Sequence, residues 1–287
     1  MAFRLFVYPL LWLISILPFS VLYGLSNLLY LLLYSMFGYR VKVVRGNLER
    51  SFPEKSAKER RTIERKFYKH LADMMLETIK GMSISESELR KRMKLSDPSL
   101  FEKLAAEGKS VIVVMSHCGN WEWVCLAADI SAPQHAQCVY KTLSSPNWEQ
   151  WFYKVRSRFG TEPFPMEKTL RHMSANAHKL TATAFIGDQN PANGKNAYWT
   201  TFLNQDTCFM QGSEKIAKKF GHAVIYLQAE KVARGYYVCH TNMLCDTPSQ
   251  TSDGEITEMI ARATEKDILS QPENWLWSHR RWKHKRD

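Results

Sequence analysis

The N-terminal apolar stretch is the feature that most limits what this chain can fold into. From Leu5 to Phe37 the sequence contains no charged residue, and basic residues flank it at Arg4 and within residues 40–45. The stretch is longer than the ~20 residues that a helix needs to cross a bilayer, but Pro18 divides it into two helical pieces. We therefore expect a single membrane span, a hairpin that dips into one leaflet, or an anchor at the interface.

A cleaved signal peptide is the alternative, because a short basic start precedes an apolar region. The apolar region is longer than a signal peptide needs, lacks a convincing cleavage site of small residues, and is followed by basic residues typical of a cytoplasmic flank. We predict that residues 1–39 are retained as a membrane anchor. Residues 40–287 are predicted to form a single domain with a basic, Trp-rich C-terminal segment.

Charge and cysteine content narrow the partners and the compartment. The formal net charge is +11 with a pI near 9.3, which predicts an anionic partner such as nucleic acid, anionic lipid or an acidic carrier protein. Six cysteines are scattered without C-x-x-C or zinc-ligand spacing. We expect reduced thiols in a cytosol-facing domain and no metal site.

Residues 40–95 are rich in charge and helical in pattern. The apolar face of the predicted helix carries Ile63, Phe67, Leu71, Met74 and Met75 at spacings of mostly three and four residues, and Gly81 is expected to end it. The opposite face carries many Lys and Arg side chains, which either face solvent or lie against anionic lipid headgroups.

Strand-like and helix-like segments alternate after residue 100. The predicted strands are 110–116, 136–142, 181–187 and 223–232, and the predicted helices are 121–130, 147–159, 168–178, 211–220 and 254–270. Asp253 is expected to cap the last helix. This alternation predicts the α/β class, with a mixed, largely parallel central sheet flanked by helices.

The stretch "SHCGNWEW", residues 116–123, is the main candidate for chemistry. His117 follows a predicted strand, where open α/β sheets place ligand sites, and a turn at Gly119 would let Glu122 fold back toward the imidazole. A carboxylate on one ring nitrogen fixes the tautomer and leaves the other nitrogen free to act as a base. Cys118 is a poor candidate nucleophile, because adjacent side chains point apart and the sequence offers it no second histidine.

Several segments together resemble the bacterial lipid A late acyltransferases, the lauroyl and myristoyl transferases of the lysophospholipid acyltransferase superfamily. "SHCGNWEW" resembles the His-x-x-x-x-Glu motif of that family. The other matching segments are "NLERSFPEKSAKER" (47–60), "SPNWEQWFYKVRSRFG" (145–160), "GDQNPANGKNAYWTTF" (187–202) and "PENWLWSHRRWKHKR" (272–286). The resemblance implies a glycerolipid-acyltransferase-like fold.

The resemblance also implies a reaction. An acyl chain would pass from acyl carrier protein, or from acyl-CoA, to a hydroxyl of a lipid A precursor, with no cofactor. His117 would deprotonate the hydroxyl and Glu122 would orient His117. Arg156 would stabilise the oxyanion, with a backbone N–H near Gly119 as the alternative.

The expected substrate-binding residues are Arg156, Arg158, Asp188, Gln189 and Asn120. Asp188 and Gln189 follow a predicted strand, where Asp188 either caps a turn or helps to hold a polar headgroup or the surroundings of the motif histidine. We favour the second interpretation.

The C-terminal segment alternates aromatic and basic residues. Trp275, Trp277 and Trp282 stand among Arg, Lys and His residues, a pattern that suits either single-stranded nucleic acid or lipid headgroups. Beside an apolar anchor we predict an anionic membrane surface and no nucleic acid. The resemblance implies the cytoplasmic face of a bacterial inner membrane. An acyltransferase for a glycerophospholipid or another glycolipid, and a lipid-binding protein without turnover, remain as alternatives.

Overall fold

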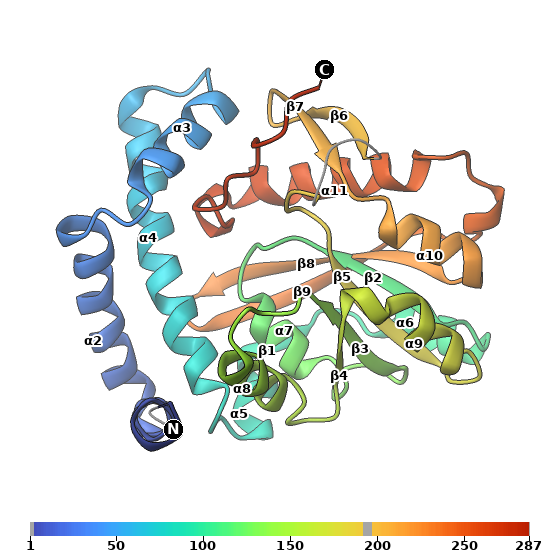
Figure 1. The fold of residues 1–287 in the computed structure, drawn as a ribbon, viewed down its shortest axis with the longest axis horizontal. Helices are drawn as coiled ribbons and strands as arrows, with labels where there is room; N and C mark the ends of the chain where they lie inside the picture. The colour runs from blue at the N-terminus through green and yellow to red at the C-terminus, as the bar shows by residue number, and fades with distance from the viewer. Residues whose placement is uncertain (1–2, 192–196, 287) are drawn as a thin grey trace.

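The computed structural model describes residues 3–191 and 197–286, and residues 192–196 of the segment at 187–202 lie outside it. A seven-stranded sheet in the order β1-β9-β8-β2-β5-β3-β4 forms its centre, with helices on both faces (Figure 1). Its strands are β1 (Met93–Leu95), β2 (Val111–Met115), β3 (His135–Tyr140), β4 (Glu162–Pro165), β5 (Thr181–Ile186), β8 (Ala223–Ala233) and β9 (Tyr236–Cys245). The β8–β9 pair is antiparallel and the other pairs are parallel, so the predicted α/β class is confirmed.

The helices include all five that the alternation predicted after residue 100. The α-helices are α1 (Tyr8–Ile16), α2 (Phe19–Tyr30), α3 (Val41–Ser51), α4 (Ala57–Lys80), α5 (Glu86–Arg92), α6 (Ser99–Ala106), α7 (Trp121–Ala127), α8 (Pro146–Arg156), α9 (Thr169–Ala175), α10 (Gly212–Phe220) and α11 (Glu255–Ser270). The other, shorter helices are the π-helices η1 (Phe3–Val7) and η2 (Leu31–Met36) and the 3-10 helices η3 (Met166–Lys168), η4 (Pro248–Gln250) and η5 (Pro272–Asn274).

The central strand β2 divides the core into two layers. Its odd-numbered residues, such as Val113, pack in the cluster with α5, α6 and α7, while Ile112 and Val114 pack with α9, α10 and α11. All five β2 side chains are buried, because a parallel strand covered on both faces needs apolar residues throughout. The helices cover the two faces of the sheet and leave the carboxyl ends of β2 and β5 free to carry a site.

A third apolar cluster joins elements from both ends of the chain. It packs α3 and α4 against the hairpin of β6 (Tyr198–Phe202) and β7 (Gln205–Phe209) and against the C-terminal segment. Trp275 and Trp277 are 2% and 0% exposed, so the prediction that they lie at a membrane surface is wrong. They are core residues, and Trp282 packs beside them.

Helix α2 lies along α4 at one side of the molecule, with α1 turned across its lower end (Figure 1). Among the described residues, the stretch Phe19–Met36 is the only helix that is long and apolar enough to cross a membrane. Only 11% of this stretch is buried inside the protein. Helix α4 begins with a capping box at Ser56 and ends at Lys80 before Gly81, as predicted.

Two local expectations were wrong. Met75 is 41% exposed, because the buried face of α4 turns away from it toward Met74 and Leu71. Asp253 does not cap α11: the N-cap position is Gly254 in a left-handed conformation, and the Asp253 carboxylate binds Lys218.

Candidate functional site

Two adjacent parallel strands bring the central residues of the site together. Met115 at the end of β2 is in register with Ile186 at the end of β5. The chain continues two residues beyond each strand to His117 and Asp188. Because the two strands run in the same direction side by side, residues far apart in the sequence meet at one edge of the sheet.

Asp188 holds the imidazole of His117. The Asp188 Oδ1 atom lies 2.5 Å from His117 Nδ1, and Oδ2 accepts hydrogen bonds from the His117 backbone N–H at 2.8 Å and from Trp275 Nε1 at 2.7 Å. Burial by itself would raise the pKa of Asp188, but the charge and hydrogen bonds of His117 lower it to about 2. The ionised carboxylate therefore fixes the Nδ1–H tautomer and leaves His117 Nε2 as the basic atom.

Glu122 does not take that position. It lies in the first turn of α7, as expected, but its two oxygens accept hydrogen bonds from Arg156 Nε at 2.8 Å and Nη2 at 2.7 Å. Burial lowers the pKa of Arg156, and the negative charge of Glu122 outweighs this and raises it. The expectation that Glu122 orients His117 is therefore corrected: the carboxylate that contacts the imidazole is Asp188, which follows β5.

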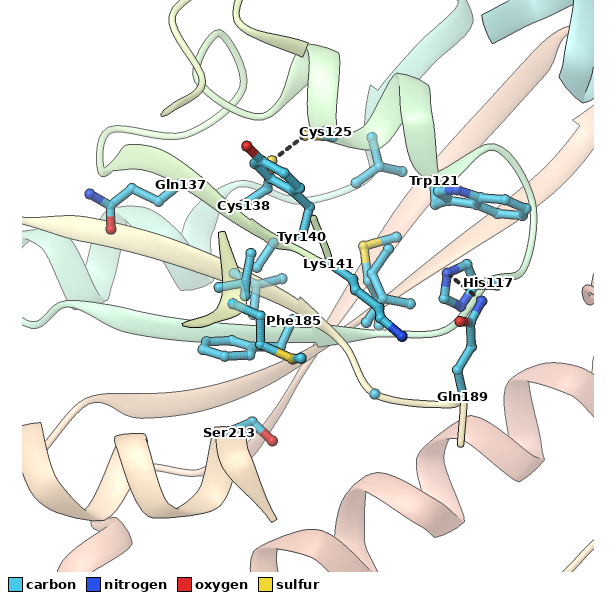
Figure 2. A pocket seen from close by; sticks show the side chains of 18 of the residues that line it. His117, Trp121, Cys125, Gln137, Cys138, Tyr140, Lys141, Phe185, Gln189 and Ser213 are labelled. Atoms are coloured by element: carbon cyan, nitrogen blue, oxygen red, sulfur yellow. Dashed lines mark hydrogen bonds between the residues drawn. The ribbon is translucent and has the colours of Figure 1, made fainter. Parts of the chain in front are cut away.

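A deep cavity of about 1050 Å³ opens beside His117. Figure 2 shows His117 and Gln189 at one end, with Trp121 above the imidazole and Tyr140, Phe185 and the Cys125–Cys138 pair around the wall. The inner wall is made mainly of apolar side chains: Met93, Leu95, Phe101, Val113, Met115, Val124, Ala184, Ile186 and Leu227. Gln189 Nε2 lies 3.2 Å from His117 Nε2, so its amide contacts the basic nitrogen directly.

Two of the predicted substrate-binding residues have structural roles instead. Asn120 is 0% exposed: it caps α7 by accepting from the Trp123 N–H at 3.0 Å and donates to Glu77 at 2.7 Å. Arg158 donates to the backbone carbonyls of Gly81 and Ile84, which follow α4. The N–H of Gly119, the alternative oxyanion donor, is bonded to the Asn274 carbonyl.

A buried polar network supports the loop that carries His117. Glu77 on α4 accepts from Asn120, from Tyr23 at 2.9 Å and from Tyr237 at 2.8 Å, and burial raises its pKa. His70 Nε2 donates to the Gly119 carbonyl at 3.1 Å, and burial followed by the nearby Lys231 lowers the pKa of His70 to about 3. These α4 residues carry no local sequence signal and were missed, whereas Trp275 was noticed but assigned to a membrane surface.

Cys118 is no better a candidate nucleophile in the structure than in the sequence. Cys118 is buried, and burial followed by the charge of Asp267 raises its pKa well above the ordinary value. All six cysteines are free thiols. In the described part of the chain, no group of three or more His, Cys, Asp or Glu side chains is arranged to hold a metal ion.

Comparison with known proteins supplies the context for this geometry. The family model for bacterial lipid A biosynthesis acyltransferases matches residues 2–284. The chain belongs to this family. The lipid A biosynthesis palmitoleoyltransferase of Escherichia coli (strain K12) is 23% identical over 275 residues, covering 95% of this chain and 88% of that protein. The lipid A biosynthesis lauroyltransferase of the same organism is 23% identical over 278 residues, covering 95% and 89%.

Membership in the family makes this protein an acyltransferase of lipid A biosynthesis, so the family resemblance and the predicted enzyme class are confirmed. In this acyltransferase the charged side chains that line the cavity carry a net positive charge, and we call them the basic mouth. Outside the Arg156–Glu122 pair they are Arg40, Lys141, Lys215, Arg280 and Lys283, against Glu149 and Glu167. An apolar interior below a cationic mouth suits a ligand with a hydrocarbon chain and an anionic head.

Proposed function

We propose that this protein transfers a fatty acyl chain from a thioester donor to a hydroxyl of a lipid A precursor, with His117 as the general base. The observation that carries the proposal is the His117–Asp188 pair at one end of an apolar cavity of about 1050 Å³. The inner wall would take the acyl chain, while the basic mouth would meet anionic groups of the donor or the acceptor.

In the proposed mechanism His117 Nε2 accepts the proton of the acceptor hydroxyl while the Nδ1–H remains bonded to Asp188. The hydroxyl oxygen attacks the thioester carbonyl, and the tetrahedral intermediate collapses as the C–S bond breaks. The imidazolium then returns its proton to the leaving thiolate, so no acyl-enzyme forms. Asp188 stabilises the imidazolium between the two proton transfers.

Gln189 is the oxyanion donor that we propose in place of Arg156. Its Nε2 lies 3.2 Å from His117 Nε2, where the reacting carbonyl must come, whereas Nε and Nη2 of Arg156 are bonded to Glu122. An incoming hydroxyl would displace the Gln189 amide from the imidazole and leave it beside the new tetrahedral centre. In this scheme, Glu122 positions Arg156 in the cavity wall.

Both an acyl carrier protein and acyl-CoA present an anionic, phosphate-bearing arm, so both fit the basic mouth as donor. We propose acyl carrier protein as the physiological donor. Residues 1–39 would hold the catalytic domain of residues 40–287 at the cytoplasmic face of a bacterial inner membrane, where the lipid acceptor lies.

The test uses the purified full-length protein with a lipid A precursor and either acyl carrier protein thioesters or acyl-CoA thioesters. Mass spectrometry of the product is expected to show a gain of one acyl chain, and the faster donor class is the physiological one. The His117→Ala variant should lose this activity, whereas His240→Ala should keep it, because His240 pairs with Glu230 on β8 and is not part of the cavity lining.

Acylation of a glycerophospholipid in place of the lipid A precursor would refute the proposed acceptor. Product formation by His117→Ala at the wild-type rate would refute the proposed base. Tight lipid binding without any product from either donor would identify a lipid-binding protein without turnover.

A further inference from the structure

The two ends of the apolar N-terminal stretch both contact the catalytic domain. At the beginning, the ring of Phe3 lies edge-on to Trp148 of α8, with 5.0 Å between ring centroids. At the end, the Tyr39 carbonyl accepts a hydrogen bond from Tyr68 Oη at 2.5 Å. A helix that crossed a bilayer between these points would place one end on the far side of the membrane, away from the domain.

Polar contacts continue along the inner face of this stretch. Ser26 Oγ donates to Asp73 at 2.6 Å, and Tyr23 Oη donates to Glu77 at 2.9 Å. Lys80 Nζ donates to the carbonyls of Ser15 and Leu17 at the end of α1, at 2.8 and 2.9 Å. If α2 left α4 to span a bilayer, buried carboxylates would lose these partners. If α2 stayed packed, the charged side chains of α4 would enter the hydrocarbon, which is costly.

The outer face of the same helices is apolar and exposed. The large side chains that are at least 37% exposed there are Leu5, Phe6, Tyr8, Leu10, Trp12, Leu13, Ile16, Val21, Leu25, Leu28, Leu31, Met36 and Phe37. Helix α2, which carries part of this face, lies at one side of the molecule (Figure 1). A continuous apolar surface of this size is typical of a membrane or protein interface.

Cations next to this apolar face indicate what kind of surface binds to it. A cleft of about 350 Å³ between α2, α4 and the β8–β9 turn is lined by Lys66, Lys69, Lys231 and Arg234, against the carboxylates of Asp73 and Glu273. Lys66 pairs with Glu273, and Lys231 and Arg234 share Asp73, so the four cations exceed the two carboxylates beside α2. Anionic headgroups attract such basic clusters, so the surface suits an anionic lipid leaflet.

We propose that residues 3–37 form an anchor that lies in the plane of one leaflet and does not span the membrane. The inner face of α2 stays on α4, the outer face enters the acyl-chain region, and the N-terminus remains on the same side as the catalytic domain. This inference rests on the membrane association proposed above, and it specifies how that association is made.

Sidedness gives the first test. The full-length protein would carry an epitope before Met1 in one version and after Asp287 in another, and protease would be added to spheroplasts or to inverted membrane vesicles. The in-plane anchor predicts that both epitopes are protected in spheroplasts and digested in inverted vesicles. Digestion of the N-terminal epitope in spheroplasts would show a span and overturn the inference, while leaving the proposed reaction intact.

Cross-linking in the membrane gives the second test and separates the in-plane anchor from a hairpin inserted away from the domain. The double variant Phe3→Cys/Trp148→Cys should cross-link with a short bismaleimide in isolated membranes, and each single variant provides the control. Absence of the cross-link in the membrane-bound double variant, with the same variant cross-linking in detergent, would overturn the in-plane anchor.

A matched pair of substitutions tests the outer face. Leu28 on α2 and Leu269 on α11 are each 54% exposed, but only Leu28 lies on the proposed membrane face. Leu28→Glu should lower the membrane-bound to soluble ratio by about tenfold or more, because it removes an apolar side chain from the leaflet and adds a charge. Leu269→Glu should leave the ratio unchanged. Equal effects would overturn the inference, and a soluble wild-type protein would overturn the proposed membrane association as well.

Discussion

Replacing Asp188 with Asn tests which carboxylate orients the catalytic histidine. Oδ2 of Asp188 accepts from the His117 N–H and from Trp275 Nε1, so the Asn oxygen is expected to keep that position. The Asn NH₂ group then faces His117 Nδ1. Since an amide NH₂ donates, Nδ1 must accept, and the proton moves to Nε2, where a base needs a lone pair.

The structure sets the size of the expected effect. The charge and hydrogen bonds of His117 lower the pKa of Asp188 from 3.8 to about 2 against the opposing effect of burial, so the carboxylate is ionised beside the imidazole. An Asn side chain carries no charge and imposes the wrong tautomer, so kcat should fall by up to about 10⁴-fold. The melting temperature should change little, because the size and two hydrogen bonds are kept.

Steady-state kinetics of Asp188→Asn and Glu122→Gln, side by side, provide the assay. Glu122→Gln breaks the ion pair with Arg156 but leaves the His117–Asp188 contact, so a smaller fall in kcat is expected. A loss below tenfold for Asp188→Asn together with a loss near 10⁴-fold for Glu122→Gln would refute the reasoning and restore Glu122 as the orienting residue.

Three further changes test the surroundings of the site. Trp275→Phe removes a hydrogen bond to the Asp188 carboxylate and should lower kcat about tenfold or more. The control is Trp277→Phe, which removes the indole that donates to the Pro272 carbonyl; it should affect thermal stability without this loss of kcat. Gly119→Ala should destabilise the protein by clearly more than Gly221→Ala in denaturant titrations: both positions have a positive φ, near +62° and +68°, but only at Gly119 would a Cβ lie 2.4 Å from the Ala229 carbonyl oxygen. Burial raises the pKa of Asp267 from 3.8 to about 6. The protonated carboxyl therefore stabilises the fold below pH 4, and this contribution, on the order of 3 kcal/mol, is lost as the pH rises to 6. Asp267→Asn should abolish that part of the pH dependence of stability, and an unchanged pH profile would contradict the assignment.

The sequence by itself determined the elements and the location of the chemistry. Short apolar runs rich in β-branched residues identified strands such as β2, and helical periodicity identified five helices, because local burial patterns are written directly into residue order. His117 was found from its place after a strand, and the turn at Gly119 and the start of α7 followed from the same local rules.

Only the tertiary structure decided which residues act together. Asp188 reaches His117 because β2 and β5 are neighbours in register, a fact of strand pairing between segments 71 residues apart. Glu122 is only five residues from His117, yet Arg156 from α8 takes both of its oxygens. Trp275 and Trp277 stand in a segment with the composition of a membrane surface and are buried, since a side chain's environment depends on what the rest of the chain packs against it. Likewise, hydropathy alone identified the apolar stretch at the N-terminus. The contacts that its two ends make with one domain, visible only in the tertiary structure, indicate how the stretch is held.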